Sequence, residues 1–380
     1  MGSSHAISGQ AISLDDNLGR ELRCWVVPMI TTKQELTTHR TCAQETEPSI
    51  GIFDSGLGGL TVVREVLAQM PNVAIRYIAD QAHVPYGERP LPEVESFALQ
   101  LTHHLIRAEN AALVVMACNI SSSVALASAE AQVGAHAVLG VIEPGVGHAL
   151  SVTQNQRVGV LATTGTVKSG AYTKTFNRLS PETFVVEVAC PEFVPLIEAS
   201  LIESEEARAA AARRLAVLVE AGVDTVVLGC THYPLMLKTL EGVLGPKAGV
   251  MRFVDPARAT AARAAAKLVH LVASPTDAAA AAAAARPITP VTPPTPSTAF
   301  IHSMPPTQRV PPAQAPWPHM ADAGGTRSAP EHTWMTTGEP GAFRAQLERF
   351  APELLAHGVV RALRWDEIEP RRATATAPRA

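Results

Sequence analysis

Short apolar runs alternate with longer amphipathic segments between Ile50 and about Ala273. The apolar runs are rich in Val, Ile and Leu and have the length of strands that are buried on both faces of a parallel sheet. They cover Ile50–Phe53, Ala74–Ala79, Leu113–Ala117, Val138–Ile142, Val158–Ala162, Phe184–Val188, Thr225–Leu228 and Met251–Val254. Helix-like patterns lie between them, for example over Leu60–Met70, Val94–Glu109, Ser121–Gln132 and Glu205–Ala221. This alternation predicts an α/β fold with mainly parallel sheets.

The pattern is lost at both ends of the chain and in one internal stretch. Residues 1–48 mix charged and polar residues, and we expect them to form a disordered leader; the acidic residues before their one apolar patch do not fit a secretory signal. Residues 275–330 contain an oligo-Ala tract and a Pro/Thr-rich stretch, which predict an extended, disordered insertion. After it we expect a strand, a helix and a strand, followed by a loose tail at 369–380. These three elements cover His332–Thr336, Pro340–Phe350 and Val359–Leu363.

Composition narrows the class of protein. The chain has 31 Lys and Arg against 35 Asp and Glu, a formal net charge of −4, which gives nucleic-acid phosphates no electrostatic attraction. Its apolar runs fall short of the roughly 18 residues that a membrane helix needs. The five cysteines are odd in number and irregularly spaced, so they predict no disulfide framework and favour a reducing cytoplasm.

Two pairs of segments repeat at nearly the same distance along the chain. Val114–Asn119 (VVMACN) is similar to Val226–Thr231 (VVLGCT), with the two cysteines 112 residues apart. Gly51–Gly56 is similar to Gly159–Thr164, with an offset of 108 residues. Because the two offsets nearly agree, we infer two related α/β halves.

Four candidate residues follow the predicted strands directly, namely Asp54, Cys118, Thr163 and Cys230. Ligands of open α/β sheets bind beyond the carboxyl ends of the strands. If the halves face each other, Cys118 and Cys230 present sulfur from opposite walls of one cleft. Inversion at a carbon atom needs such a pair, because one base removes a proton from one face and a second group delivers a proton to the other.

The surroundings of Cys118 favour a reactive thiolate. Asn119 and the serines at 121–123 make a polar helix start, whose amides stabilise an anion. Asp54 is a candidate for assisting the thiol. The glycine-rich turn Ser55–Gly59 can offer backbone N–H groups to a carboxylate.

On the other side, Cys230 is followed by Thr231 and His232. The imidazole can exchange a proton with the thiol or with a substrate. Glu143, which precedes a proline at a predicted strand end, either orients His232 or caps a helix.

Each candidate also has a purely structural interpretation. A cysteine at the end of an apolar strand is often an inert core residue, although two at equivalent positions argue against this. His232 could serve only as a hydrogen-bonding group and Asp54 only as a helix cap. Cys190 precedes a proline and is predicted to pack. A zinc site is disfavoured, because the sequence contains no C-x₂-C or H-x₃₋₅-H pair.

Taken together, these motifs resemble those of the glutamate racemases, cofactor-independent enzymes of the aspartate/glutamate racemase family that supply D-glutamate for bacterial peptidoglycan. The resemblance runs from about Ile50 to Ala273 and resumes near Thr336–Pro340 with Phe343. It rests on GIFDSGLGGL (51–60), PYG (85–87), ACN (117–119), VIEP (141–144), ATTGT (162–166), SGAY (169–172), CPEFVP (190–195) and GCTHYP (229–234).

The resemblance implies roles for individual residues. Cys118 would be the base that acts on D-glutamate and Cys230 the base that acts on L-glutamate, assisted by Asp54 and His232. The residues that bind the amino acid would be Asp54, Ser55, Tyr86, Gly87, Asn119, Ile120, Thr231 and His232.

It also implies two pseudo-symmetric three-layer α/β domains with the active site in the cleft between them. The first domain would comprise residues 49–145, 251–274 and 331–368, and the second residues 146–250. No cofactor and no metal are implied. The expected ligand is a small-molecule substrate, L- or D-glutamate, in a cytoplasmic enzyme compatible with a homodimer and without nucleic-acid or membrane partners.

One departure falls inside the predicted site, where the family usually has Thr and this chain has Ile120. Losing one substrate hydrogen bond costs roughly 0.5–1.5 kcal/mol, or up to about tenfold in affinity, unless Ser121 or Ser122 compensates. Two other functions therefore stay open. One is a racemase for aspartate or another acidic amino acid, and the other is a binding protein of the gyrase-inhibitor type with weakened catalysis.

Overall fold

The computed structural model describes residues 48–245, 251–273 and 330–368. Strands and helices alternate along these ranges, and the strands pair in parallel, which confirms the predicted fold class. The strands are β1 (Ser49–Asp54), β2 (Ala74–Ala79), β3 (Ala111–Met116), β4 (Val138–Gly140), β5 (Arg157–Ala162), β6 (Phe184–Ala189), β7 (Thr225–Gly229), β8 (Arg252–Val254), β9 (His332–Thr336) and β10 (Gly358–Ala362). The helices are α1 (Leu60–Gln69), η1 (Tyr86–Glu88), α2 (Leu91–Arg107), α3 (Asn119–Val133), α4 (Ile142–Val152), α5 (Thr164–Ser169), α6 (Ala171–Leu179), α7 (Phe193–Glu198), α8 (Glu205–Glu220), η2 (Tyr233–Met236), α9 (Leu237–Leu244), α10 (Pro256–Ala273), α12 (Pro340–Phe350), α13 (Pro352–Leu355) and α14 (Trp365–Ile368).

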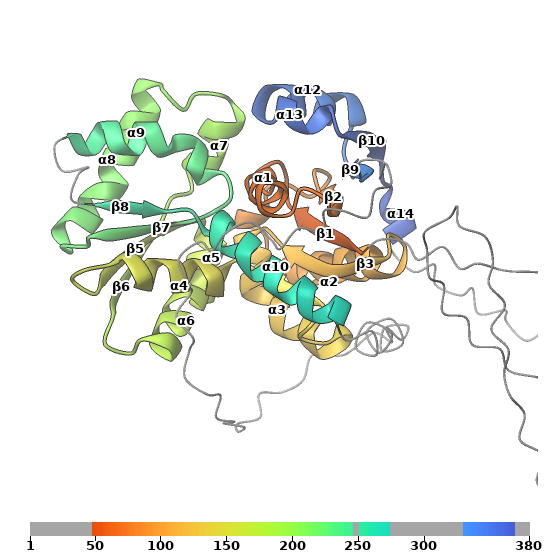
Figure 1. Ribbon diagram of the computed structural model, residues 1–380. Coiled ribbons are helices and arrows are strands. Elements are labelled where there is room, and N and C mark those ends of the chain that lie inside the picture. The colour runs from red at the N-terminus through yellow and green to blue at the C-terminus, as the bar shows by residue number, and fades with distance from the viewer. Residues whose placement is uncertain (1–47, 246–250, 274–329, 369–380) are drawn as a thin grey trace, which may run out of the picture. The chain divides into compact units, whose positions relative to one another are not determined.

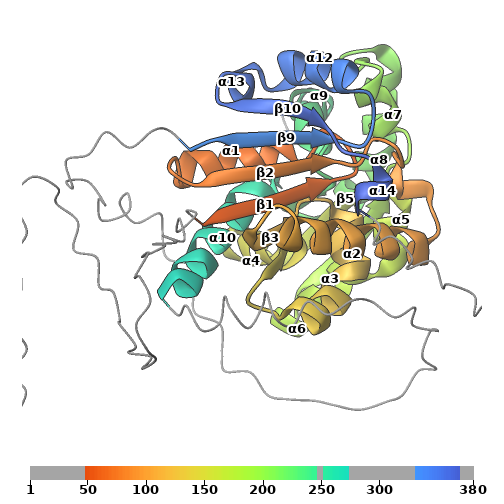
Figure 2. The same cartoon turned by 90° about the vertical axis from the view of Figure 1, so that its right-hand side faces the viewer.

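Six of the described strands form one sheet in the order β10-β9-β2-β1-β3-β4 (Figure 2). β1 is buried along its whole length, and its apolar side chains Ile50, Ile52 and Phe53 serve the cores on both faces of the sheet. Ile50 and Ile52 belong to the core beneath α1 and α10, whereas Phe53 belongs to the core beneath α2 and α3 (Figure 1). The sheet is therefore the middle layer of three.

The other four described strands form a second sheet in the order β6-β5-β7-β8. Val226 and Leu228 pack into a core shared with α8 and α9. Val160 and Val227 face the opposite core, which α4 and α6 cover. The second sheet thus has the same three-layer arrangement, and both sheets belong to one compact unit.

Local capping explains where several helices begin. Ser204 accepts a hydrogen bond from the amide of Ala207 at 3.1 Å at the start of α8, as an N-cap serine does. Glu205 and Glu206 in the first turn of α8 suit the positive end of the helix dipole. Thr163 occupies the N-cap of α5, so one strand-end residue singled out in the sequence caps a helix.

Two sequence-based boundaries were wrong. The apolar run predicted as a strand over Val138–Ile142 pairs only as far as Gly140, and Ile142 already begins α4. β8 was expected in the first domain but pairs with β7 in the four-stranded sheet. An apolar strand of three residues carries no information about which sheet it joins, whereas α10 after it contacts α1 as expected.

The predicted leader, insertion and tail lie almost entirely outside the described residues. Within the described part of the chain, no helix is both long enough and apolar enough to cross a bilayer.

Candidate active site

The two thiols singled out in the sequence line one cavity. Cys118 follows β3 of the six-stranded sheet and Cys230 follows β7 of the four-stranded sheet, and both are free and buried. The cavity has about 610 Å³ of space between atoms when the open solvent at its mouth is included. It is lined by Ser55, Val84, Pro85, Tyr86, Gly87, Glu88, Cys118, Asn119, Ile120, Thr163, Thr166, Cys190, Pro191, Val194, Pro195, Gly229, Cys230, Thr231 and His232.

Cys118 sits at the amino-terminal end of α3, where it is the N-cap residue. Its Sγ lies 3.9 Å from Ser55 Oγ and its side chain is 5% exposed. Burial, together with the charge of Asp54, raises the pKa of the Cys118 thiol to about 12. The main-chain amide and the hydroxyl of Ser121 act in the opposite direction and lower this pKa.

Cys230 has a different neighbour, because its Sγ lies 3.9 Å from Nδ1 of His232. On the other side of the ring, Nε2 lies 2.8 Å from Oε1 of Glu198. Burial alone would lower the pKa of His232, but hydrogen bonding to Cys230 and Glu198 and the negative charges nearby raise it well above 6.5. The arrangement thus places a basic imidazole beside the Cys230 thiol.

Asp54 lies behind the cavity and is not among its lining residues in the described structure. Its carboxylate is fully buried, and Oδ2 accepts from the amides of Gly56 at 3.3 Å and Gly59 at 3.0 Å. The hydroxyl of Thr231 donates to Oδ1 at 3.3 Å. Asp54 therefore holds the glycine-rich turn and joins it to the segment that carries Cys230.

Tyr86 and Asn119 line the cavity, but one polar atom of each side chain is already hydrogen-bonded to another residue. The Tyr86 hydroxyl donates to Oδ2 of the buried Asp80 at 2.5 Å, so its proton is not available to a ligand. Oδ1 of Asn119 accepts from the Tyr172 hydroxyl at 2.7 Å, which leaves the NH₂ group of Asn119 available to a ligand.

Ile120 is 3% exposed and packs in a small apolar cluster with Tyr86, Val94 and Cys118. A Cβ placed on Gly165 would lie 2.3 Å from Ile120 Cδ1, so the isoleucine fills the space above this glycine. Gly87 lies against Thr163 in a similar way, since a Cβ placed on Gly87 would lie 3.0 Å from Thr163 Cβ. These contacts bring the loop after β2 against the segment after β5.

Sequence reasoning missed Glu198 and assigned a candidate role to the wrong glutamate. Glu143 pairs with Arg178 at 2.7 Å, and both side chains are more than half exposed. Glu198, the last residue of α7, pairs with His232 instead. Thirty-four positions separate these two residues, and no local motif signals their contact. Asp80 was missed for the same reason.

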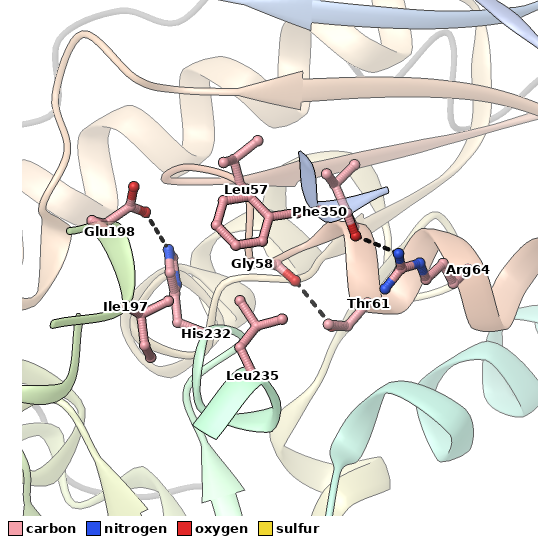
Figure 3. A pocket seen from close by; sticks show the side chains of 10 residues that line it. Leu57, Gly58, Thr61, Arg64, Ile197, Glu198, His232, Leu235 and Phe350 are labelled. Carbon is pink, nitrogen blue, oxygen red and sulfur yellow. Dashed lines mark hydrogen bonds and ion pairs between the residues drawn. The ribbon is translucent and has the colours of Figure 1, made fainter. Parts of the chain in front are cut away.

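A second, smaller cavity also has His232 in its lining (Figure 3). The dashed line in Figure 3 marks the bond between the ring and Glu198, with Leu57 and Phe350 nearby. His232 is therefore common to the linings of both cavities. No cluster of three or more His, Cys, Asp or Glu side chains suited to a metal ion occurs among the residues that the structure describes.

Comparison with known proteins identifies the family of the chain. The profile of the family described as Asp/Glu/Hydantoin racemase matches residues 56–264, more than half of the chain. The protein belongs to this family.

Individual relatives have narrower names than the family. The chain is 44% identical over 213 residues to a glutamate racemase of Geobacter metallireducens, covering 56% of this chain and 77% of the relative. Its fold is similar to that of a Bacillus anthracis glutamate racemase isoform, with a TM-score of 0.63, 27% identity and coverage of 83% and 97%. It is also similar to the Escherichia coli glutamate racemase solved with L-glutamate and the activator UDP-MurNAc-ala, with a TM-score of 0.57, 28% identity and coverage of 84% and 99%.

Proposed function

We propose that the protein is a glutamate racemase that interconverts L- and D-glutamate with two thiols and without a cofactor. The observation that carries the proposal is that Cys118 and Cys230, which end corresponding strands of two sheets, line the same cavity. The names of the relatives support glutamate as the substrate.

In the direction from L- to D-glutamate, the thiolate of Cys230 removes the Cα proton and the thiol of Cys118 delivers a proton to the opposite face. Cys230 ends as a thiol and Cys118 as a thiolate, which is the form that acts on D-glutamate. His232, paired with Glu198, accepts the proton of Cys230 and so prepares its thiolate.

The site must also stabilise the carbanion-like species formed at Cα, because this proton is very weakly acidic. Groups with available donors line the cavity, among them the NH₂ group of Asn119 and the hydroxyl of Ser55. Such preorganised dipoles act strongly in a small, water-poor site. We assign them to the substrate's carboxylate groups.

Cellular roles follow from this activity. We propose that the enzyme works in the cytoplasm and supplies D-glutamate for peptidoglycan. Aspartate is the alternative substrate, since Ile120 provides no hydroxyl, and it is tested by assaying both amino acids under the same conditions. A role in binding gyrase stays a prediction from the sequence.

The decisive experiment is a chiral assay in D₂O without added cofactor. We expect deuterium to enter Cα of both glutamate enantiomers. Cys118→Ser and Cys230→Ser should each abolish racemisation, yet each should still eliminate halide from one enantiomer of a 3-halogenated glutamate, because one base survives.

Cys190→Ala provides the matched control, since this third thiol lines the same cavity and its Sγ donates to the carbonyl of Val188. It should keep racemase activity. Absence of deuterium incorporation in the unmodified protein, or full activity in either serine variant, contradicts the proposal.

A further inference from the structure

Two of the three serines at positions 121–123 hydrogen-bond to the backbone through their side chains. Ser122 Oγ donates to the carbonyl of Met116 at 2.8 Å and lies 3.2 Å from the amide of Val141, which donates to it. Ser123 Oγ donates to a carbonyl of its own helical turn at 2.7 Å. Neither hydroxyl is available to a thiol or a substrate, which removes Ser122 as a replacement for the hydroxyl missing at Ile120.

Ser121 differs from both neighbours. Its side chain is fully buried, and its Oγ forms no regular hydrogen bond with any residue in the ranges the structure covers. Most buried hydroxyls in proteins have a partner. An unpaired hydroxyl in the first turn of α3, three residues after Cys118, calls for a functional explanation.

The geometry of a helix start supplies one. Cys118 is the N-cap and Ser121 is the third residue of α3. At such a start the N-cap side chain accepts from the amide of the second or third residue, so the amide of Ser121 is placed to donate to an acceptor at position 118. The neutral thiol makes no cap bond and instead points toward Ser55 Oγ, at 3.9 Å. A thiolate, which has no proton to donate, is the better acceptor.

The electrostatics act in the same direction. The amide and the hydroxyl of Ser121 each lower the pKa of Cys118, against burial and against the charge of Asp54. Ile120 cannot contribute, because it carries no hydroxyl and packs against Tyr86. The serine at 121 is thus the hydroxyl that α3 can offer to this sulfur.

We propose that Ser121 is a positioning residue for Cys118, whose hydroxyl and amide both donate to the sulfur once the thiol has lost its proton. The thiolate is then held at the helix start, ready to take the Cα proton of D-glutamate. This role rests on the proposed racemase activity, although its effect on the thiol can be measured without turnover.

The test measures alkylation of each thiol in the full-length protein by iodoacetamide at pH 8, followed by peptide mass spectrometry. In Ser121→Ala, loss of a hydrogen bond to a charged group raises the pKa of Cys118 by about one unit or more. A thiolate with a higher pKa is also a stronger nucleophile, and this offsets about half of the expected decrease in the logarithm of the alkylation rate. We therefore expect alkylation of Cys118 to slow by about threefold, with Cys230 unchanged.

Ser123→Ala is the matched control, because it removes a hydroxyl from the same turn that bonds to Ile120. It should leave both thiols at their original rates. For both Ser121→Ala and the unmodified protein, the Cys118 rate should rise about tenfold per unit between pH 7 and 10, since the pKa lies near 12. Plots of the logarithm of the Cys118 alkylation rate against pH should therefore be parallel for the two proteins.

An unchanged Cys118 rate in Ser121→Ala overturns the proposal, and so does an equal slowing at Cys118 and Cys230, which would report a general structural effect. Failure of the unmodified protein to racemise glutamate would instead refute the proposed activity, while the alkylation result would still decide the role of Ser121.

Discussion

At the scale of single residues, the two thiols of the site have different neighbours. Cys230 lies beside an imidazole that is held by a carboxylate, whereas Cys118 lies at a helix start and beside the hydroxyl of Ser55. Under the proposed mechanism, each thiolate is therefore stabilised in its own way.

Glu198→Gln tests the imidazole side. The amide keeps the size of the side chain but removes its charge, so the pKa of His232 should fall. Losing a charged hydrogen bond worth about 1.5–3 kcal/mol should lower kcat/KM by about tenfold or more. Racemisation kinetics and the ring nitrogen chemical shifts of His232 across pH 5–9 measure the two effects.

Glu143→Gln is the control for this change, because Glu143 forms an exposed pair with Arg178, and such pairs contribute little. It should leave kinetics and the His232 titration unaltered. Equal losses in the two glutamine variants would show that the Glu198 contact has no special part in catalysis.

At the scale of elements, the turn between β1 and α1 fits tightly against the segment after β7. A Cβ on Gly58 would lie 2.3 Å from Thr231 Oγ1 and 2.7 Å from His232 Nδ1. The backbone of this turn approaches the site too closely for any side chain, which is a role that glycine fills.

Gly58→Ala should therefore displace Thr231 and His232 while the fold is retained. We expect racemisation to slow by about tenfold or more, because misplacing a catalytic group has an effect of this order. Activity and circular dichroism measure the two outcomes. Gly147→Ala in α4 is the matched control, because its Cβ would meet nothing within 4 Å. It should keep activity and raise the free energy of unfolding by about 0.5–1 kcal/mol.

At the scale of the whole molecule, the last described segment completes the six-stranded sheet. β9 pairs with β2, and Trp334 is fully buried in the core beneath α1. The same segment reaches the site through Asp80, which accepts from Thr337 at 2.6 Å and Trp365 at 3.1 Å as well as from Tyr86. Stability and site geometry therefore both depend on residues 330–368.

Trp334→Ala should lower the free energy of unfolding by about 3–5 kcal/mol, the usual cost of truncating a large buried aromatic side chain. Urea unfolding followed by circular dichroism measures it. Val359→Ala on the neighbouring strand is the comparison, because its side chain is 54% exposed and the change should cost less than about 1 kcal/mol. Equal losses would argue against a structural role for this segment.

Removal of residues 1–47 tests the remaining sequence-based expectation. All residues that line the cavity lie between Ser55 and His232, so the shortened protein should racemise glutamate at the original rate. Loss of activity in the folded, shortened protein would mean that the leader takes part in catalysis.

The sequence by itself determined the α/β class and the positions of the two thiols, because buried parallel strands are continuous apolar runs and the residues after them fall at one edge of a sheet. It did not determine that Glu198 rather than Glu143 holds His232, that β8 joins the second sheet, or that Ser121, alone among the three serines after Cys118, keeps its hydroxyl unpaired. These three features depend on contacts between segments that are distant in the chain, and on which side-chain hydroxyls already hydrogen-bond to the backbone. Only the tertiary structure decides such contacts, since local patterns record burial and not the identity of the neighbour.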